Sequence, residues 1–315
     1  MFERHPPRPV SLVGNGGIEV DEKGLLTVRR GAAAPAPAAG APLNIVLRDK
    51  MFHHYYHTVE SSLIMHACLR QYYPGRALDT LYLPAPGWNN PKQHRLQSLL
   101  LPAVFPGLRI MDETARYPLA AERLLFLDRA KQVAPHGIMI ESWLDVLALH
   151  QEAYRHAVLR TLGLAPRARR SGRQKLLYVL RTAPRELVLP LEATMLRALA
   201  AVCEVTIADF AVLDWKQQVA AAADADIMLG VHGNGLTNLL WMPPGAMVME
   251  LFPPGARVYC YQFLSELSGF RYRGIDGDLV MRNGERHGLP TRPEVVRKPV
   301  QALDISLLVR LLREE

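Results

Sequence analysis

The sequence is poor in cysteine and has no apolar run long enough to cross a membrane. Cys68, Cys203 and Cys260 are widely spaced and form no CxxC pair, which argues against a disulfide framework and a structural zinc site. We expect all three to pack in cores. The longest apolar runs are strand-sized, against the roughly 20 residues of a transmembrane helix. The first residues do not read as a secretory signal, so we expect no membrane association to be encoded in this sequence.

The length and composition predict two globular domains. Of the 315 residues, 49% are apolar, which excludes a disordered or fibrous chain. At about 150 residues per domain, two cores can form.

The formal net charge of +7 is concentrated in one segment. Residues 153–185 contain nine Lys or Arg residues and no carboxylate, whereas the rest of the chain has 28 basic against 30 acidic residues. A local positive field of this kind favours an anionic ligand near residues 155–185. We expect no nucleic-acid partner, because the sequence has no recognition-helix, zinc-finger or RNA-binding signature.

Residues 1–42 predict a peripheral β-hairpin followed by a linker. Residues 10–13 and 18–20 are β-prone runs on either side of a Gly-Asn-Gly-Gly sequence, which we interpret as a hairpin turn, and a third β-prone run at 25–28 follows the turn-like residues 21–24. This sequence does not complete a dinucleotide fingerprint, because Glu19 stands where the third glycine belongs. The Ala/Pro tract at 32–42 has the composition of a linker.

From residue 43 onwards, strand-like and helix-like runs alternate, which favours parallel sheets covered by helices. The Arg-, Pro- and Gly-rich stretch 161–175 interrupts the alternation, so we predict an N-terminal domain at 43–165 and a C-terminal domain at 172–315. The first has predicted strands at 44–47, 78–83 and 124–127 and helices at 58–70 and 141–161. The second has predicted strands at 175–180, 204–207, 227–231 and 246–251 and helices at 190–202, 215–223, 236–241 and 304–313. We therefore predict an α/β protein of two Rossmann-like domains facing across a cleft, with the last helix packing back on the first domain.

The segment with the clearest chemical character follows the strand predicted at 227–231. It reads Gly230-Val231-His232-Gly233-Asn234-Gly235-Leu236-Thr237. A strand that runs through a glycine-rich turn into a helix leaves backbone NH groups and a positive dipole end facing outward, where phosphate binds well. The glycine spacing fits neither standard phosphate-loop pattern, so a tight turn that serves only packing is the alternative.

The same run, with Met242-Pro243-Pro244-Gly245 and Glu250 after it, resembles the signature of glycosyltransferase family 61, particularly its fungal members. Residues 52–60 (FHHYYHTVE) resemble the aromatic-His and acid motif of that family, and residues 178–185 (YVLRTAPR) resemble its strand followed by paired arginines. The resemblance covers residues 45–270. Asn234 stands where many relatives have alanine, and fungal-type members often have asparagine at this position.

The resemblance implies a GT-B fold in which the second domain holds most of the nucleotide sugar. It also implies an enzyme that moves a sugar from a UDP-sugar, of the N-acetylglucosamine or xylose type, to a hydroxyl of a glycan or glycoprotein. Transfer in the family is usually inverting, with no obligatory metal or other cofactor. Eukaryotic members are usually anchored in the Golgi or ER lumen; because no anchor is seen in this sequence, a cytosolic or truncated protein is the alternative.

We expect the second domain to bind the donor. Arginine side chains four residues apart beyond a strand can place guanidinium groups on a diphosphate, whose charge grows as the glycosidic bond breaks. His232 is expected to donate to a phosphate or the sugar, and Glu250 to accept from ribose hydroxyls. The alternative for Arg181 and Arg185 is that they form an exposed basic surface. The alternative for Glu250 is that it takes part in a structural ion pair. The predicted donor-binding residues are Arg181, Arg185, His232, Gly233, Asn234, Gly235, Leu236, Thr237 and Glu250.

An inverting transfer also needs a base for the acceptor hydroxyl. The family motif places an acid at Glu60, which is therefore the first candidate. Thr58 is the expected N-cap, which puts Glu60 in the first helical turn, where the dipole favours the carboxylate. His57 is the second candidate, with Glu60 orienting it. The alternative is that Glu60 only complements the helix dipole and that the neighbouring histidines pack among tyrosines.

Three other functions use residues of the same sequence. His53, His57 and Glu60 have the i, i+4, i+7 spacing of a zinc site on one helix face, which would suit a zinc-dependent hydrolase, but the run before Thr58 is a poor helix start. The DxD tripeptides at 224–226 and 276–278 are of the kind that metal-dependent transferases use; we interpret the first as a strand start and the second as a turn. A relative that binds a nucleotide or glycan without turnover is the third alternative.

Overall fold

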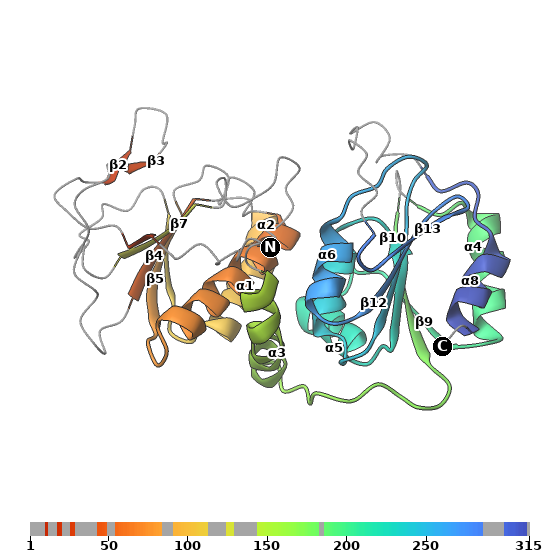
Figure 1. Ribbon diagram of the computed structural model, residues 1–315, viewed down its shortest axis with the longest axis horizontal. Coiled ribbons are helices and arrows are strands. Elements are labelled where there is room, and N and C mark those ends of the chain that lie inside the picture. Colours follow the sequence, from red (N-terminus) through yellow and green to blue (C-terminus); the bar gives the residue numbers. More distant parts are fainter. Residues whose placement is uncertain are drawn as a thin grey trace, which may run out of the picture. The chain divides into compact units, whose positions relative to one another are not determined.

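The structure is a computed structural model, and it divides into two compact units, Met1–Val158 and Leu159–Glu315, which we describe separately. Figure 1 shows its elements. The predicted linker at 32–42, His53 and Arg185 lie outside the described residues. The structure describes residues 10–11, 18–20, 26–28, 43–48, 54–83, 91–112, 124–128, 144–182, 186–285 and 299–313.

The first unit contains a sheet in the order β1-β7-β4-β5-β6. Neighbouring strands of this sheet are parallel, except that β1 is antiparallel to β7. The elements of the sheet and its helices are β1 (Val10–Ser11), β4 (Leu43–Arg48), α1 (Tyr55–Tyr72), β5 (Leu78–Leu83), α2 (Pro91–Val104), β6 (Arg109–Asp112), β7 (Leu124–Asp128) and α3 (Leu144–Thr161). A separate antiparallel pair consists of β2 (Ile18–Val20) and β3 (Leu26–Val28).

The direction of winding changes at β4. The chain passes from β4 to β5 and β6 on one side and returns as β7 on the other side of β4. In an open α/β sheet, this reversal opens a crevice at the carboxyl ends of the strands involved. Helix α1 follows β4, so its first turns belong to this carboxyl edge and its last turn to the opposite, amino edge.

Two expectations for this unit were wrong, and two of its elements were not predicted. Helix α1 begins at Tyr55 and not at Thr58, because the buried Tyr55 and Tyr56 pack in the core. Helix α2 and strand β6 were not predicted. The hairpin expected between residues 10–13 and 18–20 is not formed, because β1 pairs with β7 and β2 pairs with β3.

The second unit contains a sheet in the order β13-β12-β11-β10-β8-β9, parallel throughout except for the antiparallel β13. Its strands are β8 (Lys175–Val179), β9 (Glu204–Ala208), β10 (Ile227–Val231), β11 (Met247–Leu251), β12 (Arg271–Asp276) and β13 (Leu279–Arg282). Its helices are α4 (Leu189–Ala200), α5 (Trp215–Ala223), the 3-10 helix η4 (Asn234–Trp241), α6 (Cys260–Leu267) and α8 (Ile305–Arg313).

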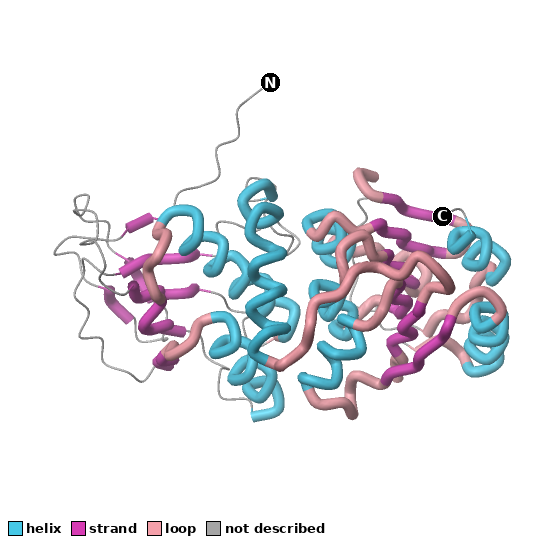
Figure 2. Tube along the Cα trace, turned by 90° about the horizontal axis from the view of Figure 1, so that it is seen from below, coloured by secondary structure: helices cyan, strands magenta, loops and turns pink. Residues whose placement is uncertain are grey.

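Helices cover both faces of this sheet, with α4 and α8 on one face and α5 and α6 on the other (Figure 1). The view turned by 90° likewise shows its strands between two groups of helices (Figure 2). Every residue of β10 is buried, as expected for a parallel strand covered on both faces. Helix α8 packs against α4 and contributes Leu307, Leu308 and Leu311 to the core of this unit. The apolar face of α8 thus belongs to the core of its own unit, and its packing on the first domain stays a prediction.

The winding of this sheet reverses at β8. The chain passes from β8 to β9 on one side, and β10 then pairs with the other side of β8. The crevice of a doubly wound sheet lies at such a switch point, outside the carboxyl ends of the strands. Residue Arg181 follows β8 and the glycine-rich run follows β10, so both lie at this carboxyl edge.

Two predictions from composition can be compared directly with the structure. Among the described residues, no helix is both long and apolar enough to span a bilayer. Cys68 and Cys203 are buried free thiols, which confirms their expected core position, whereas Cys260 is half-buried.

Candidate functional site

The glycine-rich run forms the turn between β10 and η4 at the switch point of the second sheet. The helix begins at Asn234, two residues before the predicted start. The NH of Leu236 donates to the carbonyl of Gly233 at 2.9 Å, and the amide of Asn238 donates to the carbonyl of Gly235 at 3.1 Å. The indole NH of Trp241 in turn donates to Asn238 Oδ1 at 3.1 Å. Asn238, which was not among the predicted site residues, therefore fixes the shape of the turn.

Arg181 lies directly against this turn. A β-carbon built on Gly233 would be 2.5 Å from Cζ of Arg181 and 2.7 Å from each terminal nitrogen. Only glycine therefore leaves the guanidinium in its place. Arg181 is half-buried and has no ion-pair partner among the residues that the structure describes. Arg185, its predicted companion, is outside the described part of the chain.

The other two glycines of the turn serve packing. A β-carbon on Gly235 would be 2.8 Å from Cγ1 of Val179, and one on Gly230 would be 3.1 Å from Cδ2 of Leu236. Packing against β8 and η4 is thus a sufficient reason for these two glycines. It does not account for Gly233, whose missing side chain makes room for a cation.

His232 is held by a chain of buried hydrogen bonds. Its Nδ1 lies 2.5 Å from Oε1 of Glu250, and the hydroxyl of Tyr272 donates to Oε2 of the same carboxylate at 2.6 Å. Glu250 is 0% exposed, so both of its oxygens are occupied within the protein. The expectation that Glu250 accepts from ribose hydroxyls is therefore wrong; this carboxylate instead fixes the orientation of the imidazole and leaves Nε2 for a ligand.

Tyr272 reaches Glu250 because Gly274 makes room for it. A β-carbon on Gly274, which pairs with Glu250 across β11 and β12, would be 2.7 Å from the hydroxyl of Tyr272. Burial, followed by the charge of Glu250, raises the pKa of Tyr272 well above its usual range, which keeps the phenol protonated as a donor. Sequence reasoning missed Tyr272, because only the pairing of β11 with β12 reveals its neighbour.

Two aromatic rings enclose His232. Phe252 is stacked on the imidazole with a centroid distance of 5.6 Å, and the centroid of Tyr261 is 5.3 Å away. Leu236 and Thr237 are fully buried in this region. Their predicted contact with the donor is therefore wrong: they support the turn from within the core, and the NH of Leu236 is already bonded to Gly233. Asn234 and Gly235 remain partly exposed.

In the first unit, His57 and Glu60 form a pair on α1. Nδ1 of His57 lies 3.3 Å from Oε2 of Glu60, and the carboxylate is 0% exposed. His54 is the N-cap and Thr58 lies inside the helix, where its hydroxyl donates to the carbonyl of His54 at 3.3 Å. Glu60 is thus in the second turn, and the capping role expected for Thr58 is wrong. The exposed member of the pair is His57, with 15% of its side chain accessible.

Comparison with known proteins identifies the family of this chain. The family model for Glycosyltransferase 61 matches residues 43–249, which include the His57–Glu60 pair, Arg181 and the glycine-rich turn. This match covers more than half of the chain. The chain belongs to glycosyltransferase family 61.

Several curated relatives of this family 61 chain carry the same name, EGF domain-specific O-linked N-acetylglucosamine transferase. The protein of Xenopus laevis is 29% identical over 168 residues, which is 51% of this chain and 31% of the relative. That of Drosophila melanogaster is 39% identical over 79 residues, or 24% of this chain and 14% of the relative. That of Gallus gallus is 29% identical over 124 residues, which is 38% of this chain and 23% of the relative. The chain thus spans at most about a third of the length of these relatives.

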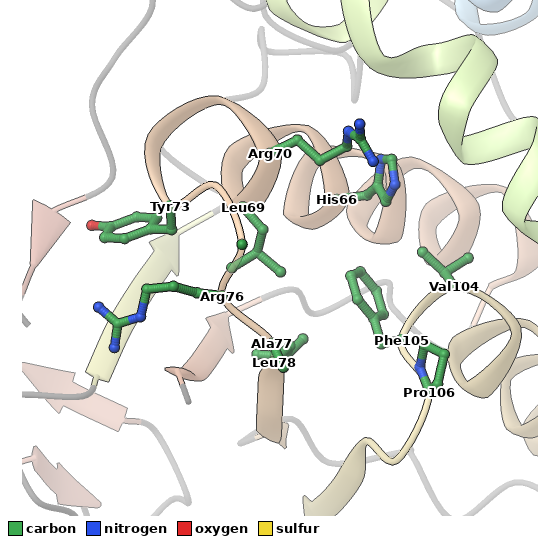
Figure 3. A pocket seen from close by; sticks show the side chains of 11 residues that line it. His66, Leu69, Arg70, Tyr73, Arg76, Ala77, Leu78, Val104, Phe105 and Pro106 are labelled. Carbon is green, nitrogen blue, oxygen red and sulfur yellow. The ribbon is translucent and has the colours of Figure 1, made fainter. Parts of the chain in front are cut away.

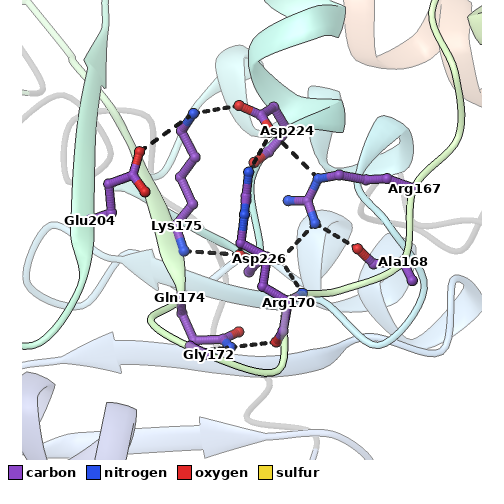
Figure 4. Close-up of polar contacts among 9 residues, drawn as sticks. All are labelled: Arg167, Ala168, Arg170, Gly172, Gln174, Lys175, Glu204, Asp224 and Asp226. Atoms are coloured by element: carbon purple, nitrogen blue, oxygen red, sulfur yellow. Dashed lines mark hydrogen bonds and ion pairs between the residues drawn. The ribbon is translucent and has the colours of Figure 1, made fainter.

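The opposite, amino edge of the second sheet contains the first DxD tripeptide of this family 61 chain (Figure 4). Asp226 is 0% exposed and accepts hydrogen bonds from Nη1 of Arg167 at 2.9 Å, from Nη1 and the NH of Arg170 at 3.1 and 3.0 Å, and from the NH of Lys175 at 2.9 Å. Asp224 pairs with Nη2 of Arg170 at 2.8 Å and with the Lys175 ammonium. Both aspartates of the tripeptide are therefore paired with cationic side chains of the same chain.

This network corrects the interpretation of the basic segment. Arg167, Arg170 and Lys175 neutralise internal carboxylates, and Arg173 donates to the carbonyl of Cys203 at 3.0 Å. Arg167, Arg170 and Lys175 are therefore compensated by Asp224 and Asp226 inside the unit, and Arg181 is a described member of the segment that lies at the carboxyl edge.

The second DxD tripeptide lies in the turn between β12 and β13, as predicted. Gly277 has φ +60°, a left-handed conformation that suits glycine. Asp276 accepts from Nε of Arg257 at 2.8 Å. Its carboxylate is therefore part of an ion pair beside the turn.

Proposed function

We propose that this chain transfers a sugar from a UDP-sugar to a hydroxyl of a glycan or glycoprotein, with UDP-N-acetylglucosamine as the first donor to test. The observation that carries the proposal is the guanidinium of Arg181 seated on Gly233 at the switch point of the second sheet. Membership of family 61 and the names of the relatives, which are N-acetylglucosamine transferases, support the donor class.

The donor diphosphate fits the surroundings of Arg181. A guanidinium can form two parallel hydrogen bonds with phosphate oxygens, and the NH groups that open a helix add further donors. The partly exposed Asn234 and Gly235 begin η4 beside the guanidinium. As the bond between the sugar and the diphosphate breaks, its electron pair passes to a phosphate oxygen, and these donors stabilise the growing charge.

His232 is proposed to contact the same group. With Nδ1 directed at the buried carboxylate of Glu250, the imidazole presents Nε2 in a fixed orientation. Tyr272 holds the carboxylate from its other side, so Glu250 and Tyr272 are positioning residues and His232 is the one that contacts the ligand.

We propose His57 as the base, oriented by Glu60. The proton of the acceptor hydroxyl passes to Nε2 of His57 as the hydroxyl oxygen attacks the anomeric carbon, with inversion. Glu60, the first candidate from sequence, is fully buried and reaches Nδ1 of the imidazole, which suits a carboxylate that fixes the tautomer. The proposal includes the GT-B arrangement, with the base on the first domain and the donor on the second.

We further propose that transfer has no obligatory metal. Arg181 and the backbone NH groups supply positive charge at the donor, and Asp224 and Asp226 are committed to arginine and lysine side chains. Nucleotide binding that survives EDTA is the corresponding expectation.

Titration of UDP and GDP into the purified chain, in the presence of EDTA, tests donor binding. We expect UDP to bind more tightly than GDP, and the Arg181→Ala variant to weaken UDP binding about tenfold or more, because hydrogen bonds to charged groups contribute roughly 1.5–3 kcal/mol. Arg197→Ala, which removes an arginine from α4, is the matched control and should bind like the wild type. Equal UDP affinity in wild type and Arg181→Ala would contradict the proposal.

Turnover separates an enzyme from a protein that only binds. We expect His57→Gln to abolish sugar transfer while UDP affinity stays unchanged, and Glu60→Gln to lower the rate less. UDP binding by the wild type without transfer to any of a panel of protein and glycan hydroxyls would favour the non-catalytic relative.

A further inference from the structure

The first unit contains a pocket of about 260 Å³ that the proposed function does not use (Figure 3). It lies where α1 and α2 end and β5 begins, which is the amino edge of the sheet. His57 is nine residues before the pocket residue His66, or about 13 Å along an α-helix. The pocket is therefore distinct from the proposed base. Its apolar wall consists of Leu69, Leu78, Val104, Phe105 and Pro106.

His66 is the buried polar group of this pocket. It is 8% exposed, its ring contacts Tyr154 at a centroid distance of 5.6 Å, and its Nδ1 has no hydrogen-bond partner among the residues that the structure describes. Burial, followed by the charges of Arg70 and His150, lowers the pKa of His66 to about 4. The neutral ring can donate one hydrogen bond and accept another, and leaving a buried nitrogen unpaired is costly.

Arg70 lies next to His66 at the same end of the pocket. The two residues are four apart on α1, and Figure 3 shows their side chains together above the ring of Phe105. Arg76, the other arginine of the lining, directs its guanidinium away from this end, towards Tyr73. One end of the pocket thus combines a guanidinium with a neutral imidazole, and the remainder is apolar.

We propose that this pocket binds a small organic carboxylate with an apolar body. The carboxylate lies between the guanidinium of Arg70, whose fork matches two carboxylate oxygens, and the ring of His66. The apolar body packs on Leu69 and Phe105. The volume of about 260 Å³ is below the roughly 300–1,000 Å³ of typical small-molecule sites, so the ligand is about the size of benzoate.

Arg70 also has a structural role that the experiment must separate from binding. It lies in the last turn of α1, where a cation stabilises the negative end of the helix dipole. This role predicts a small loss of stability in Arg70→Gln and no effect on a ligand. The carboxylate site predicts a loss of binding whatever the change in stability.

The test is calorimetric titration of the full chain with benzoate and, as an uncharged ligand of the same shape, benzamide. We expect saturable binding of benzoate, much weaker binding of benzamide, and an affinity for benzoate reduced about tenfold or more in Arg70→Gln. Arg160→Gln, an exposed arginine in the last turn of α3, removes the same charge elsewhere and should bind like the wild type. Ala77→Phe, which fills the pocket from its exposed rim, should abolish binding.

Nuclear magnetic resonance of the histidine rings gives a second readout. Benzoate should shift the Cε1–H signal of His66, assigned with His66→Gln, because a bound carboxylate changes the hydrogen bonding of the ring. The proposal is overturned if benzoate does not bind, if benzamide binds equally well, or if Arg70→Gln binds benzoate as the wild type does. Since none of these results involves UDP, they are independent of the proposed transferase.

Discussion

The two edges of the sheet in the second unit carry the same kinds of groups and use them differently. At the amino edge, the buried Asp226 accepts hydrogen bonds from Arg167, Arg170 and the NH of Lys175. At the carboxyl edge, the buried Glu250 is occupied by a histidine and a tyrosine, and Arg181 packs on a glycine. A buried carboxylate thus neutralises the arginines at one edge, whereas at the other edge the buried carboxylate is held by a histidine and a tyrosine, which leaves Arg181 to a ligand.

This difference shows why the count of charges alone is a poor guide to a site. The basic segment contributes to both edges, and its sequence does not distinguish the arginines that close an internal network from Arg181. The strand order makes the distinction, because it places Asp224 and Asp226 beside the start of β8 and the glycine turn beside its end.

The largest effect is expected from breaking the amino edge. Asp226→Asn places an amide NH₂ among donors, removes the charge that its half-buried arginine partners bind, and should lower the free energy of unfolding by about 3 kcal/mol. Urea unfolding measures it, and Asp278→Asn in an exposed turn is the control, expected to change stability little. UDP affinity of the folded variant should be unchanged; a parallel loss of affinity would mean that the edges are not independent.

The dependence of stability on pH below neutrality gives a second test of the amino edge. Burial tends to raise the pKa of Asp226, but hydrogen bonds from Lys175, Arg170 and Arg167 outweigh it and the pKa is lowered from 3.8. A carboxylate with a depressed folded pKa stabilises the fold above its unfolded value, and this contribution is lost as pH falls below 3.8 through the folded value. Thermal unfolding between pH 6 and pH 2 should show a steeper loss in the wild type than in Asp226→Asn. Parallel curves would sink this account of the amino edge.

A smaller effect is expected from displacing the cation at the carboxyl edge. Gly233→Ala puts a methyl group where the Arg181 guanidinium lies, so UDP affinity should fall about tenfold, or about 1.4 kcal/mol. The matched control is Gly245→Ala, where φ is +74° and no atom lies within 4 Å, so a β-carbon strains the backbone without touching Arg181. It should lower stability and leave UDP affinity intact. An unchanged affinity in Gly233→Ala would show that the contact has no part in binding.

The smallest effect is expected from the far end of the histidine network. Tyr272→Phe removes one hydrogen bond to Glu250 and should raise the activation free energy of transfer by about 1 kcal/mol, which slows transfer roughly fivefold, and it should weaken UDP binding by no more than that factor. Tyr178→Phe removes a similar bond, to Glu192 at 2.6 Å, on the opposite face of the sheet. It should affect stability alone. If both variants slow transfer equally, the network does not position His232.

Local patterns predicted the second unit well. The expected bounds of β10 and α5 agree with the structure, since a continuous apolar run reads as a buried parallel strand. A capping box between Asp214 and Gln217 begins α5. Helix α1 was predicted to begin three residues too late because Thr58 has a capping side chain, whereas the burial of Tyr55 and Tyr56 decides the start. Helix α2 has Pro102 in its interior, which obscured its helical pattern.

The candidate site was only partly readable from sequence. The glycine-rich turn and Arg181 follow apolar strands directly, so their common edge could be inferred. The pairing of Glu250 with His232 and Tyr272 could not, because it depends on β11 lying between β10 and β12. Spacing along the chain does not contain that information, and the role expected for Glu250 was wrong for this reason.

The central claim is that Arg181 and the turn at Gly233 grip the diphosphate of a UDP-sugar. A crystal structure of the full chain with UDP bound tests it most directly. The account predicts diphosphate oxygens within hydrogen-bonding distance of the Arg181 guanidinium and of backbone NH groups between Gly233 and Gly235. A diphosphate bound elsewhere, with Arg181 still packed on Gly233 and contacting no phosphate oxygen, would contradict it.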